Sequence, residues 1–259
     1  MAGAPNSWDY GYSPRPNRCN GHRPMIRKCT IAAQVFFLIN IKWVLIHMTE
    51  HYYSKQPQAK SSPQSWSFDL RGRTFQFTSD IGVFSKSEVD FGSRVLIETF
   101  QEPEINGPIL DVGCGYGPIG LSLASDFSER QIFMIDVNER AVELAAKNAE
   151  INKITNTTIL QSDLYENLNE KSFASIVTNP PIRAGKRVVH AIFEEAYNHL
   201  ADHGDLWVVI QKKQGAPSAK DKMEEIFGNA EVVTKKKGYF ILRAKSLTND
   251  WDYAKIGRC

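Results

Sequence analysis

The chain has 259 residues, a formal net charge of +2 and 42% hydrophobic residues, enough to bury the core of one large or two small domains. This is the composition of an ordinary soluble protein, which argues against a mainly disordered or a membrane-embedded chain. The net charge is too small to indicate a nucleic-acid partner, so that argument depends on local clusters at 183–187 and 235–237.

The four cysteines are scattered along the chain, without a Cys-x-x-Cys pair and without histidines at zinc-ligand spacing: Cys19, Cys29, Cys114 and Cys259. We therefore expect a reduced, cytoplasmic protein without a metal ion. Cys114 is expected to be a small packed residue and not a nucleophile, because no His-Asp arrangement adjoins it in the sequence.

The first 47 residues differ in composition from the rest. Residues 31–46 are strongly apolar behind a basic lead-in, but the run is shorter than the ~20 residues of a membrane-spanning helix and polar residues interrupt it. An interfacial or packed helix, a membrane anchor and a non-native leader before a start at Met48 are the alternatives, and we favour the leader. The predicted organisation is a leader over 1–47, a main domain over 48–246 and a C-terminal appendage over 247–259.

Strands and helices can be assigned from residue 66 onward. Alternating apolar and polar residues on either side of Arg71-Gly72-Arg73 predict a β-hairpin of strands 66–70 and 74–78. Helical spacing of apolar residues predicts helices, and short apolar runs predict strands. The elements expected next are helices 89–100, 119–127, 140–152, 188–200 and 218–227, and strands ending at Asp111 and spanning 132–136, 157–161, 173–178, 206–211, 231–235 and 239–243. This alternation is typical of an α/β fold whose parallel sheet is covered on both faces.

The apolar run Ile109-Leu110 leads through Asp111 into a glycine-rich loop that ends at Gly120. Residues 115–120 fit the Gly-x-Gly-x-x-Gly fingerprint of dinucleotide sites, with Asp136 about 20 residues further on. Residues 111–117 equally fit the acid-x-Gly-x-Gly-x-Gly loop that holds S-adenosylmethionine in class I methyltransferases. A tight structural turn without a ligand is the third alternative.

The connection between the last two predicted strands helps to choose between these ligands. A Lys-Lys-Gly link is long enough for a hairpin but too short for a parallel crossover, so the sheet should end with an antiparallel strand. Class I methyltransferase sheets end in this way and dinucleotide-binding dehydrogenase sheets usually do not. The topology therefore favours the methyl donor.

Polar or glycine-rich groups follow four of the predicted strands, at Asp111, Asp136, Asp163 and Asn179. The carboxyl ends of parallel strands lie at one edge of the sheet, where ligands bind in open α/β folds. We expect Asp136 to accept hydrogen bonds from two ribose hydroxyls, and Asp163 to meet an adenine amino group with Leu164 against the ring. The alternative role for each acid is a helix N-cap.

Asn179-Pro180-Pro181 follows the fourth strand of the sheet and is the more discriminating motif. The Asn179 side-chain carbonyl and the Pro180 main-chain carbonyl could together accept two hydrogen bonds from one NH2 group. Such a pair of acceptors directs the nitrogen lone pair toward an electrophile, and positioning of this kind is sufficient for transfer from a sulfonium methyl group.

The glycine loop 111–117, Asn179-Pro180-Pro181 and Gly82-Val83-Phe84-Ser85 together resemble the small-domain ribosomal RNA guanine-N2 methyltransferases, over about residues 52–246. The resemblance implies a Rossmann-like seven-stranded sheet, mostly parallel with an antiparallel last strand, preceded by a short β-hairpin and a helix. It also implies methyl transfer from S-adenosylmethionine to a guanine amine in small-subunit (16S) ribosomal RNA, with Asn179, Pro180 and Pro181 as catalytic residues. The cofactor residues that it implies are Asp111, Gly113, Cys114, Gly115, Gly117, Asp136, Val137, Asp163, Leu164 and Asn179.

Ile182 departs from the family pattern, because many amine methylases have an aromatic residue after Asn-Pro-Pro that stacks on the target base. We expect Phe84, or Ile182 itself, to contact the base. A target nucleotide in structured RNA must leave its stack to reach the site. Arg183, Lys186 and Arg187 are expected to contact nearby phosphates. The alternative interpretation is that these residues only form the solvent-exposed start of a helix.

Other functions remain compatible with these residues. The same Asn-Pro-Pro geometry could serve a protein glutamine amide or the N6 amine of DNA adenine, although Ile182 counts modestly against both. An NAD-binding oxidoreductase and a non-catalytic RNA-binding module are alternatives from other classes. We expect ribosomal RNA or the small ribosomal subunit as the partner, and no membrane association.

Overall fold

The computed structural model describes residues 61–247, apart from 84–87 and 171. The predicted leader and nearly all of the predicted C-terminal appendage lie outside these residues, as does Phe84, so their predictions stay untested. No helix within the described ranges is long and apolar enough to cross a membrane.

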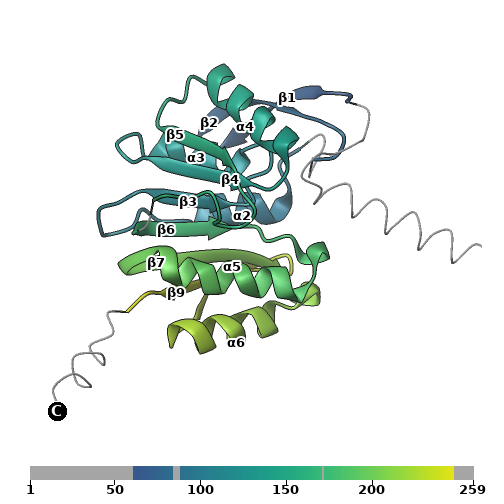
Figure 1. Cartoon of the computed structure of the whole chain (residues 1–259). Helices are drawn as coiled ribbons and strands as arrows, with labels where there is room; N and C mark the ends of the chain where they lie inside the picture. The colour runs from purple at the N-terminus through teal and green to yellow at the C-terminus, as the bar shows by residue number, and fades with distance from the viewer. Residues whose placement is uncertain (1–60, 84–87, 171, 248–259) are drawn as a thin grey trace, which may run out of the picture. The chain divides into compact units, whose positions relative to one another are not determined.

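A seven-stranded sheet carries the fold, in the strand order β5-β4-β3-β6-β7-β9-β8 (Figure 1). The five strands from β3 to β7 are mutually parallel, and β9 is antiparallel to both of its neighbours, β7 and β8. The mostly parallel sheet with its antiparallel last strand is confirmed, and β9 lies one position in from the edge. The strands are β3 (Ile109–Val112), β4 (Ile132–Asp136), β5 (Thr157–Gln161), β6 (Phe173–Thr178), β7 (Leu200–Gln211), β8 (Glu231–Lys236) and β9 (Tyr239–Lys245).

Helices cover both faces of the sheet. On one face lie α2 (Phe91–Thr99), α3 (Pro118–Asp126) and α4 (Glu139–Ile151), and on the other α5 (Lys186–His199) and α6 (Ala216–Phe227). Two short 3-10 helices precede the second pair, η1 (Ile182–Ala184) before α5 and η2 (Lys212–Gln214) before α6. Successive strand residues point to opposite faces, so Ile109 packs with α2 to α4 and Leu110 packs with α5 and α6.

The predicted hairpin forms from β1 (Gln64–Leu70) and β2 (Arg73–Ser79), which pair around the Arg71-Gly72 turn. It packs on the α4 side, where Phe77 and Trp66 both meet the ring of Tyr116 from the glycine loop edge-on, at centroid distances of 5.6 and 5.7 Å. The hairpin therefore supports the loop that follows β3.

The start of β7 differs from the prediction, because the strand begins at Leu200 and not at residue 206. Asp202-His203-Gly204 has the composition of a turn, and His203 has a φ of 64°. The segment still pairs, because the His203 N–H donates to the Ser246 carbonyl at 2.9 Å and the Ser246 N–H donates to the Gly204 carbonyl at 2.8 Å. These long-range bonds extend the strand through residues that locally favour a turn.

Candidate active site

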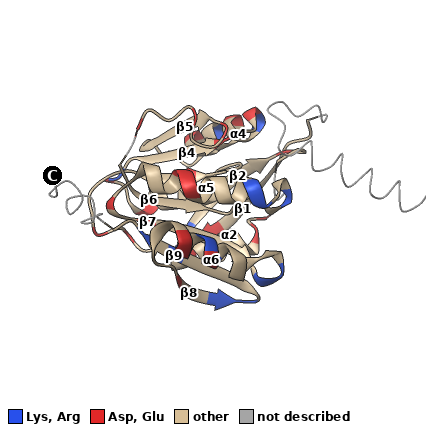
Figure 2. Cartoon of the chain, turned by 60° about the horizontal axis from the view of Figure 1, so that its bottom comes forward, with Lys and Arg blue, Asp and Glu red and all other residues tan. Residues whose placement is uncertain are grey.

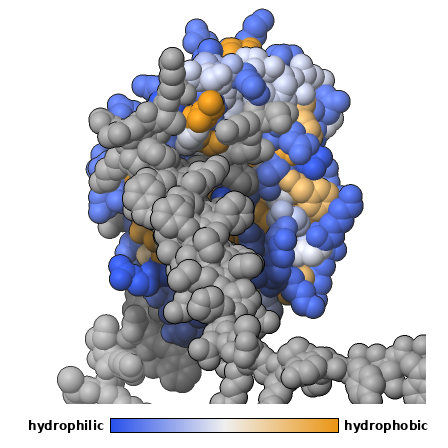
Figure 3. Space-filling view, turned by 90° about the vertical axis from the view of Figure 1, so that its right-hand side faces the viewer, coloured by the Kyte–Doolittle hydropathy of each residue, from blue (hydrophilic) through white to orange (hydrophobic). Residues whose placement is uncertain are grey.

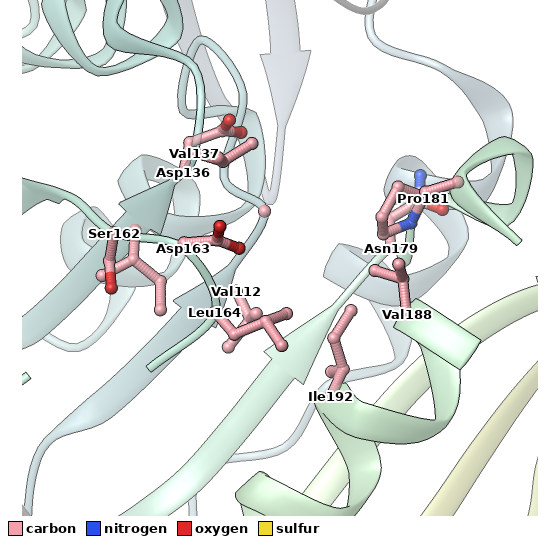
Figure 4. Close-up of a pocket in the computed structure, with 13 residues that line it drawn as sticks. Val112, Asp136, Val137, Ser162, Asp163, Leu164, Asn179, Pro181, Val188 and Ile192 are labelled. Carbon is pink, nitrogen blue, oxygen red and sulfur yellow. The ribbon is translucent and has the colours of Figure 1, made fainter. Parts of the chain in front are cut away.

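A cavity of about 270 Å³ opens at the carboxyl ends of β3, β4 and β6 (Figure 4). Figure 4 shows Asp136 and Asp163 on one side of it and Asn179 and Pro181 on the other. Its lining includes residues predicted from the sequence, namely Gly113, Asp136, Val137, Asp163, Leu164, Asn179 and Pro181. The cavity therefore lies at the carboxyl ends of the parallel strands, the edge of the sheet at which we expect a ligand from the sequence.

The glycine loop turns sharply between β3 and α3. Gly117 is the N-cap of α3 with a φ of 99°, and a Cβ there would lie 2.9 Å from the Leu121 side chain and 3.0 Å from that of Met134. Gly113 also has a positive φ, of 74°, but a Cβ there would meet nothing within 4 Å. Gly117 is thus required for packing, whereas Gly113 leaves open space on the cavity wall.

Asp111 does not line the cavity, although it was predicted to bind the cofactor. The side chains of a strand alternate, so Asp111 points toward α3 while Val112 points into the cavity. One Asp111 carboxylate oxygen, Oδ2, accepts a hydrogen bond of 2.9 Å from the Gly120 N–H, and Oδ1 has no partner among the described residues. Burial raises the pKa of Asp111 to about 7, partly offset by the Gly120 bond.

Cys114 is buried within the glycine loop, in agreement with its prediction as a packed residue. Burial raises the pKa of its thiol well above the usual value, and the nearby carboxylates of Asp136 and Asp111 raise it further. A thiol in this environment stays protonated and is a poor nucleophile.

Asp136 connects the loop to the next strand. Its Oδ2 accepts a hydrogen bond of 2.9 Å from the Gly115 N–H, and its Oδ1 accepts one of 2.9 Å from the Asn138 N–H. The side chain is nearly buried, and this burial raises its pKa in spite of the main-chain hydrogen bonds. Each oxygen keeps a lone pair that can accept a further hydrogen bond from a ligand.

Asp163 and Leu164 form the wall that follows β5. Asp163 is exposed at the rim, whereas Leu164 is half-buried. Leu164 has a φ of 51°, a left-handed conformation that is unfavourable for a leucine by about 1 kcal/mol or more. Strained residues of this kind concentrate at ligand sites, and here the strain is associated with an apolar side chain on the cavity wall.

The amide of Asn179 is held in one orientation by the start of α2. Its Nδ2 donates to Asp90 Oδ2 and to Ser93 Oγ, both at 3.0 Å. Asp90 is itself the N-cap of α2 and accepts from the Gly92 and Ser93 N–H groups. Because both amide protons are used, Asn179 Oδ1 remains as the acceptor available to a ligand.

The Pro180 carbonyl forms a tight turn with the residues that follow. It accepts a hydrogen bond of 2.8 Å from the Ile182 N–H, and Pro181 between them has φ −74° and ψ 78°, an inverse γ-turn. Pro180 itself is buried and does not line the cavity. Its carbonyl has one lone pair left for another donor.

The other predicted residues lie around the cavity and not in its wall. Cys114, Gly115 and Gly117 form the loop behind it, and Ile182 lines a second, adjacent cavity of about 180 Å³. Arg183, Lys186 and Arg187 are exposed beyond Ile182. No group of three potential metal ligands occurs within the part of the chain that the structure describes.

Several cavity residues were not identified from the sequence: Val112, Ile135, Ser162, Ala184, Val188 and Ile192. Val188 and Ile192 are four residues apart on α5, so helical spacing could have placed them on one face. The contact of Asp90 and Ser93 with Asn179 carries no local sequence signal, because 86 residues or more separate the partners.

A sheet with this strand order, a glycine loop after its first parallel strand and an Asn-Pro-Pro turn at the neighbouring strand end define the class I methyltransferases, whose methyl donor is S-adenosylmethionine. Residues 74–243 match the methyltransferase small domain family, and the chain belongs to this family. The predicted fold and family are therefore confirmed, and the dinucleotide alternative is not favoured.

The relatives of the chain differ in length. It is 67% identical over 201 residues to YbxB of Bacillus subtilis, described as an uncharacterized protein, covering 77% of this chain and 100% of YbxB. It is 32% identical to ribosomal RNA small subunit methyltransferase C of Haemophilus ducreyi, covering 62% of this chain and 49% of that enzyme. A structure of the T. thermophilus 16S rRNA N2 G1207 methyltransferase RsmC with AdoMet and guanosine is 28% identical, with a TM-score of 0.65, over 73% of this chain and 52% of that one. The chain thus spans about half the length of the methyltransferase C proteins that it matches.

Proposed function

We propose that the protein transfers a methyl group from S-adenosylmethionine to the N2 amine of a guanine in small-subunit ribosomal RNA. The observation that carries this proposal is the fixed amide of Asn179, whose Nδ2 is bound by Asp90 and Ser93 while Oδ1 remains available beside the cavity. An amine-directed acceptor in an Asn-Pro-Pro turn is the chemistry that a methylase of exocyclic amines requires.

The cavity has the features that S-adenosylmethionine needs. Gly113 leaves room for the methionine portion, and Asp136 can accept from the ribose hydroxyls. Leu164 and Ile135 offer apolar surface to the adenine ring, with Asp163 at its polar edge. When bound there, the cofactor would supply an electrophilic methyl group.

Asn179 and Pro180 would position the acceptor amine. Asn179 Oδ1 and the remaining lone pair of the Pro180 carbonyl can each accept one hydrogen bond from the NH2 group. Two such bonds favour a pyramidal nitrogen whose lone pair points into the cavity. No general base is needed before attack, because the proton can leave the alkylated nitrogen afterwards.

The relatives support guanine in ribosomal RNA as the acceptor over other amines. The names of the H. ducreyi and T. thermophilus proteins specify small-subunit ribosomal RNA, and the T. thermophilus structure contains guanosine. Ile182, in place of an aromatic residue, lies next to the cavity and would contact the base through apolar surface. The activity is thus proposed for one domain about half the length of those enzymes.

Methyl incorporation into unmethylated small ribosomal subunits from labelled S-adenosylmethionine tests the proposal. The wild-type protein is expected to label 16S rRNA, and nucleoside analysis should identify N2-methylguanosine. Asn179→Ala should lower kcat by about 100-fold or more, because it removes a positioning acceptor. Asn198→Ala, which changes an exposed asparagine on α5, is the matched control and should retain full activity.

Absence of incorporation, or equal activity of Asn179→Ala and Asn198→Ala, would contradict the proposal. Parallel assays with adenine-containing duplex DNA and with a glutamine-containing protein substrate distinguish the alternative acceptors. Label that appears only in the DNA or only in the protein substrate would show that the chain is a methyltransferase whose acceptor is that molecule and not ribosomal RNA.

A further inference from the structure

The cationic residues of the β8–β9 hairpin and of η2 lie on the same side of the fold as the cavity. Figure 2 shows Lys and Arg at the start of α5, in the loop before α6 and at the end of β8, all along one side of the chain. We define the lysine strip as Lys212, Lys213, Lys235 and Lys237, all of which are exposed. The order β6-β7-β9-β8 explains the gathering, because it brings segments far apart in sequence to one edge.

Main-chain hydrogen bonds and the strand register hold these segments together. The Lys212 N–H donates to the Gly238 carbonyl in the β8–β9 turn at 2.8 Å, and Gln211 pairs with Tyr239 directly beside it. The Lys235 ammonium lies 4.8 Å from the centre of the Phe240 ring, and that of Lys237 lies 5.1 Å from the centre of the Phe91 ring. These cation-π contacts hold two of the four charges in place.

The lysine strip differs in its pairing from three other lysines, Lys220, Lys222 and Lys236. None of its four members forms an ion pair with another described residue, whereas Lys236 between them pairs with Glu98. On α6, Lys220 pairs with Glu224, and Lys222 pairs with Glu194 and Glu225. The strip therefore presents positive charge that the described residues do not neutralise.

The strip is continuous with the proposed site. Phe91, beneath Lys237, directly follows Asp90, which holds Asn179, and it packs on Tyr239 with ring centres 5.5 Å apart. On the other side, the second cavity extends from Ile182 and Lys186 to Gln214 and Gly215, next to Lys213. The part of this side that is visible in Figure 3 carries mainly hydrophilic side chains with apolar areas between them.

We propose that the lysine strip binds the sugar-phosphate backbone of the RNA that flanks the target nucleotide. The inference rests on the proposed function and adds a second contact region to the one expected at Arg183, Lys186 and Arg187. A polyanion is the occupant that fits, because its phosphates can neutralise several adjacent cations at once. The strip would hold the RNA in register while the target guanine enters the cavity.

The test is the binding of an unmethylated 16S rRNA transcript over a range of salt concentrations. Lys212→Gln/Lys213→Gln and Lys235→Gln/Lys237→Gln should each weaken binding about tenfold at low salt and reduce the slope of log K against log salt by about 1.5 to 2. The affinity for S-adenosylhomocysteine should stay unchanged in both variants. Lys220→Gln/Lys222→Gln, which removes two ion-paired lysines, is the matched control and should bind the transcript like the wild type.

Unchanged salt slopes in both strip variants would overturn the inference, as would equal losses in the control, which would mean that only net charge matters. A wild-type protein that does not bind the transcript overturns it as well. Binding that depends on the strip without methyl transfer would leave the inference standing and contradict the proposed function. Methyl transfer by strip variants that bind the transcript as tightly as the wild type would contradict the inference and leave the proposed function standing.

Discussion

Asp90 combines two tasks at a single side chain. Its Oδ1 accepts from the Gly92 N–H, and its Oδ2 accepts from the Ser93 N–H and hydroxyl and from Asn179 Nδ2. A carboxylate can accept all of these because both of its oxygens lack protons. Asp90 therefore caps α2 and orients the amide of Asn179 through the same group.

Asp90→Asn should separate the two tasks. Asparagine is as good an N-cap as aspartate, so the free energy of unfolding should change by no more than about 1 kcal/mol. If the new carbonyl caps α2, the new NH2 group faces Asn179 Nδ2, and two donors oppose each other. We expect kcat for methyl transfer to fall about 10- to 100-fold, with little change in KM for S-adenosylmethionine.

Steady-state kinetics and urea unfolding of Asp90→Asn and Glu98→Gln test this role. Glu98 is exposed on the same helix and pairs only with Lys236 among the described residues, so its variant should retain wild-type kinetics. A fall in stability that parallels the fall in kcat would mean that Asp90 acts only as a cap.

Asp111 is the source of a pH effect on stability. Its pKa is about 7 in the folded protein against 3.8 for an exposed aspartate, because the carboxyl is fully buried. The folded state binds this proton more tightly, so the resulting stabilisation is complete below about pH 4 and is lost as pH rises through 7. Relative to Asp111→Asn, the wild type should lose roughly 2 to 3 kcal/mol of unfolding free energy between pH 5 and pH 8.

Urea unfolding of both proteins at the two pH values measures this difference. The comparison with Asp111→Asn removes the contributions of the other titrating groups, which include Asp136. Parallel pH profiles of the two proteins would show that Asp111 is ionised in the folded state at pH 5.

The strand-end rule explains why part of the cavity could be predicted from the sequence. Asp136, Asp163 and Asn179 each follow an apolar strand, and parallel strands bring their carboxyl ends to one edge whatever the details of packing. Asp90 escaped prediction because its partner Asn179 follows β6, 89 residues further along the chain, and no local sequence pattern encodes that contact. The side chain of Asp111 points away from the cavity because side chains alternate along β3. A glycine motif by itself does not specify which residues of the strand face the cavity.

At the scale of elements, Asn148 of α4 and the C-cap residue Asn152 form the hydrogen bonds to β2 that a neighbouring strand would otherwise form. Asn148 Oδ1 accepts from the Thr78 N–H at 2.8 Å, and its Nδ2 donates to the Thr78 and Tyr116 carbonyls, both at 2.9 Å. Asn152, one helical turn later, bonds the N–H and carbonyl of Gln76 in the same way. The asparagines thus satisfy the outer edge of the hairpin and join it to the glycine loop.

Asn148→Ala should destabilise the protein by about 2 to 4 kcal/mol, because it leaves one buried N–H and two carbonyls without partners. Asn148 is fully buried, so water cannot readily replace the lost bonds. Urea unfolding measures the change, with Asn198→Ala as an exposed control within about 0.5 kcal/mol of the wild type. A loss in Asn148→Ala no larger than in the control would mean that the hairpin contributes little to stability.

The order of elements was largely predictable, and their pairing was less so. Strands such as β4 and β6 begin and end where their apolar runs do, because both faces of a parallel sheet are buried. The Lys-Lys-Gly link specified the β8–β9 hairpin, but the position of β9 between β7 and β8 depends on tertiary packing. The extra residues at the start of β7 likewise depend on pairing with Ser246, far along the chain.

At the scale of the whole molecule, the described domain contains all the parts of the proposed donor site. The glycine loop, Asp136 and the wall after β5 belong to the sheet, and the hairpin supports the loop through Tyr116. Donor binding should therefore stabilise the fold as a unit, without any contribution from RNA.

S-adenosylhomocysteine at about 100 times its Kd should raise the free energy of unfolding by about 2.7 kcal/mol, which corresponds to a rise in Tm of roughly 5 to 10 °C for a domain of this size. NAD at the same concentration should give no shift, because the site belongs to the methyltransferase class. Asp163→Ala should reduce the shift, since it removes the polar group expected at the adenine edge, while the exposed Asp202→Ala should retain it. Thermal unfolding with each ligand measures these effects. An equal shift with NAD, or equal shifts in the two aspartate variants, would contradict the assignment of the cavity to the methyl donor.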